Sequence, residues 1–138
     1  MALETTIERI ADPVPVTVIA LDGELDASNF EGLIDAVQAE RAAGADRLIL
    51  DLSAMRFMAS SGLVALHSIV RIMRGEAPLD IESGWASLHA TAPPDGEERQ
   101  TTVLLCGPQP GVERVLSRTG LDRMFHVHPD RAAAIAAL

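Results

Sequence analysis

The most informative stretch of this chain runs from Asp51 to Leu63 and reads DLSAMRFMASSGL. It follows the short aliphatic run Arg47–Asp51, which is typical of a central strand, and it precedes apolar residues at helical spacing. The pattern predicts a strand, then a loop, then a helix that begins at Ser60 or Ser61. Serine is favoured at a helix start because its hydroxyl oxygen can accept a hydrogen bond from a free backbone N–H group.

Strands and helices alternate along the rest of the chain. Predicted strands cover residues 3–10, 16–21, 47–51, 102–106 and 125–127, with a turn expected at Asp22-Gly23. Predicted helices carry apolar faces from Phe30 to Arg41, from Leu63 to Met73 and from Val112 to Leu116, and a last helix runs from Arg131 to Leu138 with Asp130 as its cap. This alternation predicts an α/β domain whose sheet is parallel at least at its centre.

Residues 75–101 differ from the rest of the chain in composition. They are rich in glycine and proline and hold six acidic residues against Arg99 alone, which makes five of the chain's nine net negative charges. A stretch of this length in a small domain is either a functional loop or partly disordered. The simpler interpretation is a solvated, variable loop, and the alternative is a partner-specific contact through Trp85, because tryptophan is enriched at binding hot spots.

Composition excludes several kinds of chemistry. The 138 residues include no lysine and no tyrosine, so a Schiff base and a phosphate-loop lysine are excluded. A single cysteine, Cys106, excludes an internal disulfide and a cysteine-rich zinc site. A net charge of -9 argues against binding to nucleic acid or to anionic membranes. The N-terminal residues do not resemble a signal peptide and no apolar run is long enough to span a membrane, so we expect a cytoplasmic protein.

Neither a metal site nor a hydrolase site is predicted. His126 and His128 could form a metal-binding pair, but no further ligand cluster stands near them in the sequence, so no metal and no cofactor is expected. A serine hydrolase would need a nucleophile turn such as Gly-x-Ser-x-Gly, which the chain lacks. Cys106 lies in an apolar strand and is expected to be a small buried hydrophobic residue.

Three motifs resemble those of the STAS domain family, which is named for sulphate transporters and anti-sigma factor antagonists. The stretch Asp51–Leu63 resembles the family signature, and Gly23-Glu-Leu-Asp26 resembles a second recurring turn. Residues 103–121 are similar to the late strand and helix of the family. The resemblance leaves out only about residues 75–101. It implies one STAS-like domain over residues 1–138, an acidic insertion at about 75–101, and a small mixed sheet of four to five strands flanked by about four helices.

The resemblance also implies a function. It is that of an anti-sigma factor antagonist, which is no enzyme but regulates transcription by partner switching. Its partner would be an anti-sigma factor with serine kinase activity, which binds the unphosphorylated protein and is released when Ser61 is phosphorylated. Ser60 would cap the helix and Asp26 would lie near the contact surface. The residues expected to bind the partner are Glu24, Asp26, Met58, Ser60, Ser61 and Gly62.

Two features depart from the family pattern. Ala59 stands where many phosphorylated members carry aspartate, and compact members lack the acidic insertion. Both features favour an alternative, a STAS module without a switch. It would serve as a scaffold or regulatory module, in a stress-signalling complex or in association with a transporter, or it would bind a small ligand such as a nucleotide. On physical grounds alone, the two serines could also merely cap the helix.

Overall fold

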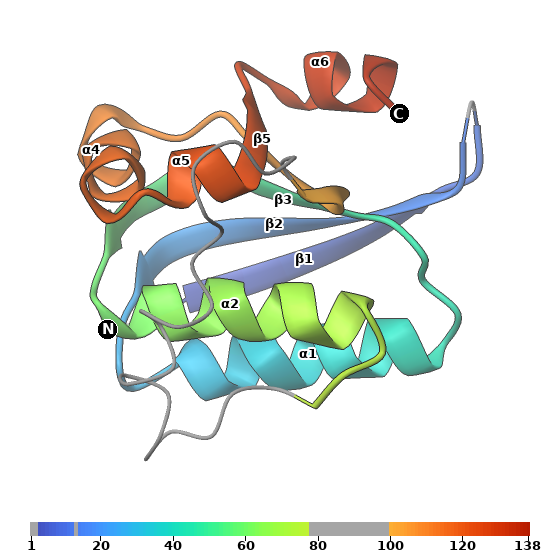
Figure 1. Ribbon diagram of the computed structural model, residues 1–138, viewed down its shortest axis with the longest axis horizontal. Coiled ribbons are helices and arrows are strands. Elements are labelled where there is room, and N and C mark those ends of the chain that lie inside the picture. The colour runs from blue at the N-terminus through green and yellow to red at the C-terminus, as the bar shows by residue number, and fades with distance from the viewer. Residues whose placement is uncertain (1–2, 13, 78–99) are drawn as a thin grey trace.

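A mixed five-stranded sheet forms the centre of the structure, a computed structural model that describes residues 3–12, 14–77 and 100–138 (Figure 1). The strands are β1 (Leu3–Ile10), β2 (Val16–Leu25), β3 (Leu48–Met58), β4 (Gln100–Cys106) and β5 (Phe125–His128). They lie in sequence order across the sheet, with β1 antiparallel to β2 and all the other neighbours parallel. The predicted α/β class with a small mixed sheet is confirmed.

Five helices flank this sheet in the described part of the chain. They are α1 (Phe30–Ala42), α2 (Ser61–Met73), α4 (Pro110–Thr119), α5 (Leu121–Met124) and α6 (Arg131–Ala136). The short helix α5 was not predicted, because four residues are too few to show a helical period. It follows Gly120, whose φ of 79° is the left-handed conformation that ends α4. The cap of α6 is confirmed, since the backbone N–H of Ala133 donates to the Asp130 carboxylate at 2.8 Å.

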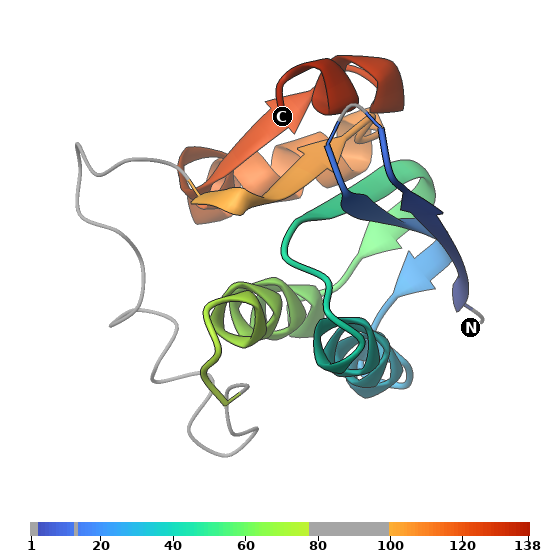
Figure 2. The same cartoon turned by 90° about the vertical axis from the view of Figure 1, so that its right-hand side faces the viewer.

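Two apolar clusters hold the helices to the sheet. Apolar residues of α1, α2, α4 and α5 join one large cluster with β2 and β3, and Ile19, Leu50 and Leu52 are among its fully buried members. A smaller cluster lies under α6, which Figure 2 shows across the sheet from α1 and α2. The smaller cluster consists of Val16, Val18, Ile49, Leu104, Cys106 and Ala134.

Strands β2 and β3 are both longer than the sequence predicted. The expected turn at Asp22-Gly23 and the expected loop after Asp51 are wrong, because both segments continue as paired strands. The pairing shifts register twice, between Ala20 and Asp22 and again between Gly23 and Glu24, and Gly23 has a φ of 123° there. Such bulges disturb the alternation of apolar and polar residues that marks a strand in a sequence.

The predicted face of α1 is confirmed with one change. Phe30, Leu33, Ile34 and Val37 are buried, and the next buried residue is Glu40 rather than Arg41. Burial of Glu40 is possible because the Arg9 guanidinium donates two hydrogen bonds of 3.0 Å to its carboxylate. The expectations for residues 78–99, including Trp85, lie outside the described residues.

Candidate functional site

Two loops meet at the edge of the sheet where the parallel strands β2 and β3 end. The backbone N–H of Ala59, which follows β3, donates a hydrogen bond of 2.8 Å to the carbonyl oxygen of Leu25, the last residue of β2. Parallel strands place their carboxyl ends at one edge of a sheet. The Gly-Glu-Leu-Asp segment and the serine-containing segment, more than 30 residues apart in sequence, are therefore adjacent in space.

The loop between β2 and α1 is braced by Asn29. Its side-chain oxygen accepts from the Asp26 N–H at 3.0 Å, and its side-chain nitrogen donates to the Glu24 carbonyl oxygen at 2.8 Å. The Asp26 carboxylate accepts hydrogen bonds from the hydroxyl and the backbone N–H of Ser28, which lower the pKa of Asp26 below its ordinary value. Asp26 is therefore a fixed negative charge at this edge.

Ser60 occupies the position just before α2 and is exposed. The expectation that its side chain caps the helix is wrong, because its hydroxyl makes no capping hydrogen bond. Its φ of -60° and ψ of -27° are helical, whereas a capping serine usually has an extended backbone from which its oxygen reaches the free N–H groups. Ser60 is therefore an exposed residue whose side chain makes no capping hydrogen bond.

Ser61, the expected phosphorylation site, is buried. It is only 6% exposed, and its Oγ has no hydrogen-bond partner among the described residues. We expected one serine to cap the helix and the other to project from the first turn, but the structure exposes Ser60 and encloses Ser61. Most buried hydroxyl groups in proteins have a partner, so this group is unusual.

Gly62 packs directly against the ends of β2 and β3. A Cβ atom at this position would lie 2.4 Å from Met58 Cγ and 3.2 Å from Leu25 Cδ2. Met58 and Leu25 are themselves buried. Met58 and Gly62, two of the residues expected to bind the partner, are both buried here, and their packing seats the first turn of α2 on the sheet.

An exposed aromatic ring marks the outer surface of this edge. Phe57 is 51% exposed and pairs with Glu24 in the parallel register of β3 and β2. Glu24 is half-buried, and Arg56 lies 3.9 Å from Asp22 nearby on the same strands. Sequence reasoning did not select Phe57 as a contact residue. The sequence does contain a signal for it, because Phe57 is an aromatic residue between the polar Arg56 and the serines.

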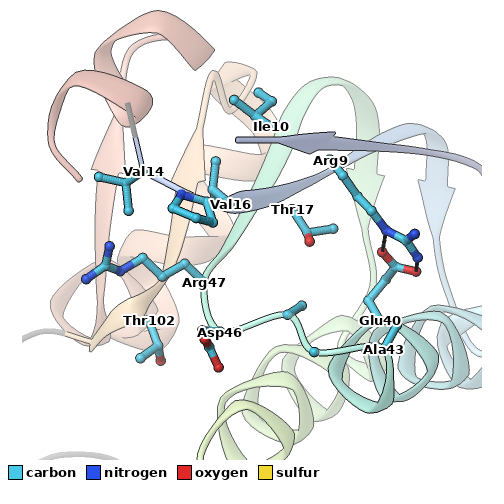
Figure 3. Close-up of a pocket in the computed structure, with 13 residues that line it drawn as sticks. Arg9, Ile10, Val14, Val16, Thr17, Glu40, Ala43, Asp46, Arg47 and Thr102 are labelled. Atoms are coloured by element: carbon cyan, nitrogen blue, oxygen red, sulfur yellow. Dashed lines mark hydrogen bonds and ion pairs between the residues drawn. The ribbon is translucent and has the colours of Figure 1, made fainter. Parts of the chain in front are cut away.

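A cavity of about 540 Å³ lies at the opposite end of the same strands (Figure 3). Its wall includes Arg9, Glu40, Thr17 and Arg47, with apolar side chains from the connection between β1 and β2. Thr17 and Arg47 are at the amino ends of β2 and β3, away from the serines. Arg9 and Glu40 already bind each other there, and their pairing lowers the pKa of the Glu40 carboxyl.

The two histidines singled out from the sequence lie on the edge strand β5. The His126 and His128 rings stack with their centroids 6.4 Å apart. Among residues 3–12, 14–77 and 100–138, no group of three or more histidine, cysteine or acidic side chains could hold a metal ion. Cys106 is buried as predicted, and burial raises the pKa of its thiol to about 12. None of the helices in the described ranges is long and apolar enough to cross a membrane.

Solved structures with this fold include several anti-sigma factor antagonists. One from Mycobacterium paratuberculosis is 24% identical and superposes with a TM-score of 0.67, covering 99% of this chain and 93% of that chain. A protein from Thermotoga maritima, proposed to be an anti-sigma factor antagonist, is 22% identical with a TM-score of 0.71, covering 96% and 92%. The Bacillus cell fate determinant SpoIIAA in its phosphorylated form is 20% identical with a TM-score of 0.61, covering 97% and 98%.

The sequence itself matches a family model as well. No curated protein matches the chain. The model of the STAS domain matches residues 6–76, which is just over half of the chain and includes both loops at the carboxyl edge of β2 and β3. The chain therefore belongs to the STAS domain family.

Proposed function

We propose that this protein is an anti-sigma factor antagonist that regulates transcription by partner switching. Its unmodified form binds an anti-sigma factor that is also a serine kinase, and phosphorylation of Ser61 releases it. The observation that carries the proposal is the joining of the two loops by the hydrogen bond between Ala59 and Leu25. This bond places Glu24 and Asp26 at the same edge as the serines. The likeness to solved antagonists supports the assignment.

Phosphorylation would change the charge of this edge sharply. The Ser61 oxygen forms a bond to the γ-phosphorus of ATP, the bond from that phosphorus to the bridging oxygen of ADP breaks, and the hydroxyl proton passes to a base on the partner. The product carries about 1.5 to 2 additional negative charges at neutral pH. Because the pKa of Asp26 is lowered, its carboxylate stays charged at the same edge of the sheet as the new group. Both charges lie on the surface that the partner contacts, so they favour dissociation by facing acidic groups of the partner or by losing their hydration in the complex.

Phe57 provides an apolar contact for the unmodified state. It is 51% exposed, pairs in register with Glu24 near the end of β2, and precedes Ser60 and Ser61 in the chain. Aromatic side chains are enriched among the few residues that carry most of the energy of an interface. We expect Phe57→Ala to weaken partner binding by about 1–2 kcal/mol without changing the fold. The exposed Ile7 of β1, replaced by alanine, is the matched control.

The proposal is tested with ATP and an anti-sigma factor kinase captured from the source organism on the immobilised protein. Radiolabel from ATP should enter the wild type and the Ser60→Ala variant but not Ser61→Ala. Ser61→Asp should bind the kinase more weakly than Ser61→Ala. Label that stays in Ser61→Ala and disappears in Ser60→Ala would contradict the assignment of Ser61, and failure to bind any such kinase would contradict the function.

A STAS module without a switch is the second candidate. The enclosed, unpartnered Ser61 Oγ favours it, as does Ala59 at the position where many switching members carry an acid. Such a module would bind its partner in one state only. Equal affinity of Ser61→Ala and Ser61→Asp for the same partner, measured at a temperature where both variants are folded, would support this candidate over the first.

A further inference from the structure

The Ser61 hydroxyl cannot be reached in the closed fold. Its Oγ is buried, the residue is 6% exposed, and no described group is hydrogen-bonded to the Oγ. Transfer of a phosphoryl group requires the acceptor oxygen to approach the phosphorus directly and in line with the leaving group. A kinase active site cannot make that approach to an oxygen covered by protein.

The first turn of α2 is held down by apolar contacts on one side of Ser61. Gly62 lies against Met58 and Leu25, and its backbone N–H donates to the Ala59 carbonyl at 2.9 Å. Met58 and Leu25 are 2% and 0% exposed, so both are fully covered. These contacts seat the turn that contains Ser61 and Gly62 on the sheet, so a movement of this turn off the sheet would separate Gly62 from these two side chains.

The neighbouring hydroxyl behaves differently. Ser60 is exposed, precedes the first helical residue and has no side-chain hydrogen bond in the capping position. The two serines are adjacent in the chain and equal in chemistry, yet only one of them is open to solvent. A difference in reactivity between the two positions can therefore be attributed to the burial of Ser61.

We propose that Ser61 is a gated modification site, reached only when the first turn of α2 lifts away from Met58 and Leu25, whereas Ser60 is reachable in the closed fold. The proposal rests on Ser61 being the acceptor in the proposed function. Local openings of a helix end are common well below the threshold of global unfolding. The unpartnered Oγ favours this opening, because the hydroxyl gains hydrogen bonds to water when the turn moves. A partner that binds the open turn would accelerate modification.

Thiol accessibility tests the gate without any kinase. Ser61→Cys and Ser60→Cys are each treated with a disulfide reagent that reports the released thiolate, under native conditions and in low urea. The wild type supplies the background, since Cys106 is buried and its pKa is raised to about 12. We expect the thiol at 61 to react at least about tenfold more slowly than the thiol at 60, with a weak urea dependence that marks a local opening.

Two methionines of β3 provide a matched pair of second substitutions. Met58→Ala removes the side chain that contacts Gly62, and Met55→Ala removes an equally buried side chain three residues earlier. In the Ser61→Cys background, Met58→Ala should raise the reaction rate by about tenfold more than Met55→Ala does, at matched global stability. Neither should change the rate at Ser60→Cys.

Three results would overturn the gate. The first is equal reactivity at positions 60 and 61, and the second is equal acceleration by the two alanine substitutions. If Ser61→Cys does not fold, amide hydrogen exchange of the wild type decides instead. A smaller free energy of opening for the Gly62 amide than for the Ile69 amide, in the middle of α2, supports a local gate. Equal free energies of opening at the two amides contradict it. None of these measurements involves a partner. A negative result would therefore reject the gated site, and the proposed function would still be decided by the kinase-binding and labelling experiment.

Discussion

Met58 packs against Gly62 so closely that a Cβ atom on Gly62 would lie 2.4 Å from the Met58 Cγ. This contact connects the last residue of β3 with the first turn of α2, and it lies one residue from the enclosed Ser61. The hydrogen bond from Ala59 to Leu25 fixes the same turn to β2. The serine segment is therefore held by the two central strands rather than by capping of its own helix.

The first prediction concerns Gly62→Ala. Alanine favours helices over glycine by about 1 kcal/mol, but here its methyl group would overlap Met58. The cost of this overlap should exceed the gain in helix propensity, so we expect the free energy of unfolding in urea to fall by about 1–3 kcal/mol. Gly32→Ala is the control, because Gly32 lies in α1 and, apart from its chain neighbours and the adjacent backbone of the helix, no atom lies within 4 Å of its Cβ position. That control should gain up to about 1 kcal/mol. A gain in both variants would show that Met58 moves aside without cost.

The existence of most elements could be predicted from the sequence, because their apolar residues recur at the strand or helix period. The length of β3 could not. Its buried residues Leu52, Met55 and Met58 are three apart, since the bulges against β2 break the alternation expected of a strand. Periodicity alone made this segment look like a loop, although it brings the serines to the edge of the sheet.

The candidate site was predictable in position but not in exposure. The motifs at Gly23-Glu-Leu-Asp26 and at the serines do meet at one edge. Ser60 is exposed and Ser61 is covered at the start of a helix whose first turn packs on Met58 and Leu25. That packing joins two strands that are distant in sequence, so no local pattern reports it.

A second prediction concerns the energetic cost of the enclosed hydroxyl. Ser61→Ala removes an oxygen that has no described partner, so its stability should be unchanged or higher by up to about 1 kcal/mol. Ser61→Asp places a carboxylate in the same covered position and should lose about 2 kcal/mol or more. Thermal and urea unfolding of both variants measure these changes. A fully stable Ser61→Asp variant would indicate that the site opens at little cost.

Ser60 provides the matched control for that experiment. Ser60→Asp puts the same charge on an exposed residue at the start of α2, where the helix dipole favours a negative group. We expect it to be neutral or to stabilise the protein by up to about 1 kcal/mol. Because Ser61→Asp is expected to be less stable than Ser60→Asp, its partner binding must be measured at a temperature where that variant is folded.

The third prediction concerns Asn29, which braces the acidic loop. Asn29→Ala removes the hydrogen bonds to the Asp26 N–H and the Glu24 carbonyl, and should lower the free energy of unfolding by about 1–3 kcal/mol. Ser28→Ala removes only an exposed hydrogen bond to Asp26 and should cost less than about 1 kcal/mol. Urea titrations compare the two variants. Equal losses would mean that Asn29 does not hold the loop.

The fourth prediction concerns pH and the attachment of α6. Arg131 of α6 donates to Asp51 of β3 at 3.0 Å and to Glu8 of β1 at 2.8 Å. Burial acts to raise the pKa of Asp51, but hydrogen bonds from Ser53 and Arg131 outweigh it and hold the pKa below its ordinary value of 3.8. A lowered carboxyl pKa stabilises the fold above pH 3.8, and this contribution is lost as the pH falls through the folded value.

Asp51→Asn should therefore lower the Tm at neutral pH, by about 2–4 °C, and the gap to the wild type should close as the pH falls below 3.8. The control is Asp46→Asn, because the Asp46 side chain is 87% exposed and its pair with Arg41 is a surface ion pair of little worth. Its Tm should follow the wild type at every pH. A constant gap for Asp51→Asn across the acid range would show that Asp51 contributes by packing alone. In that case the charge of Arg131 would not be what holds α6 to the sheet.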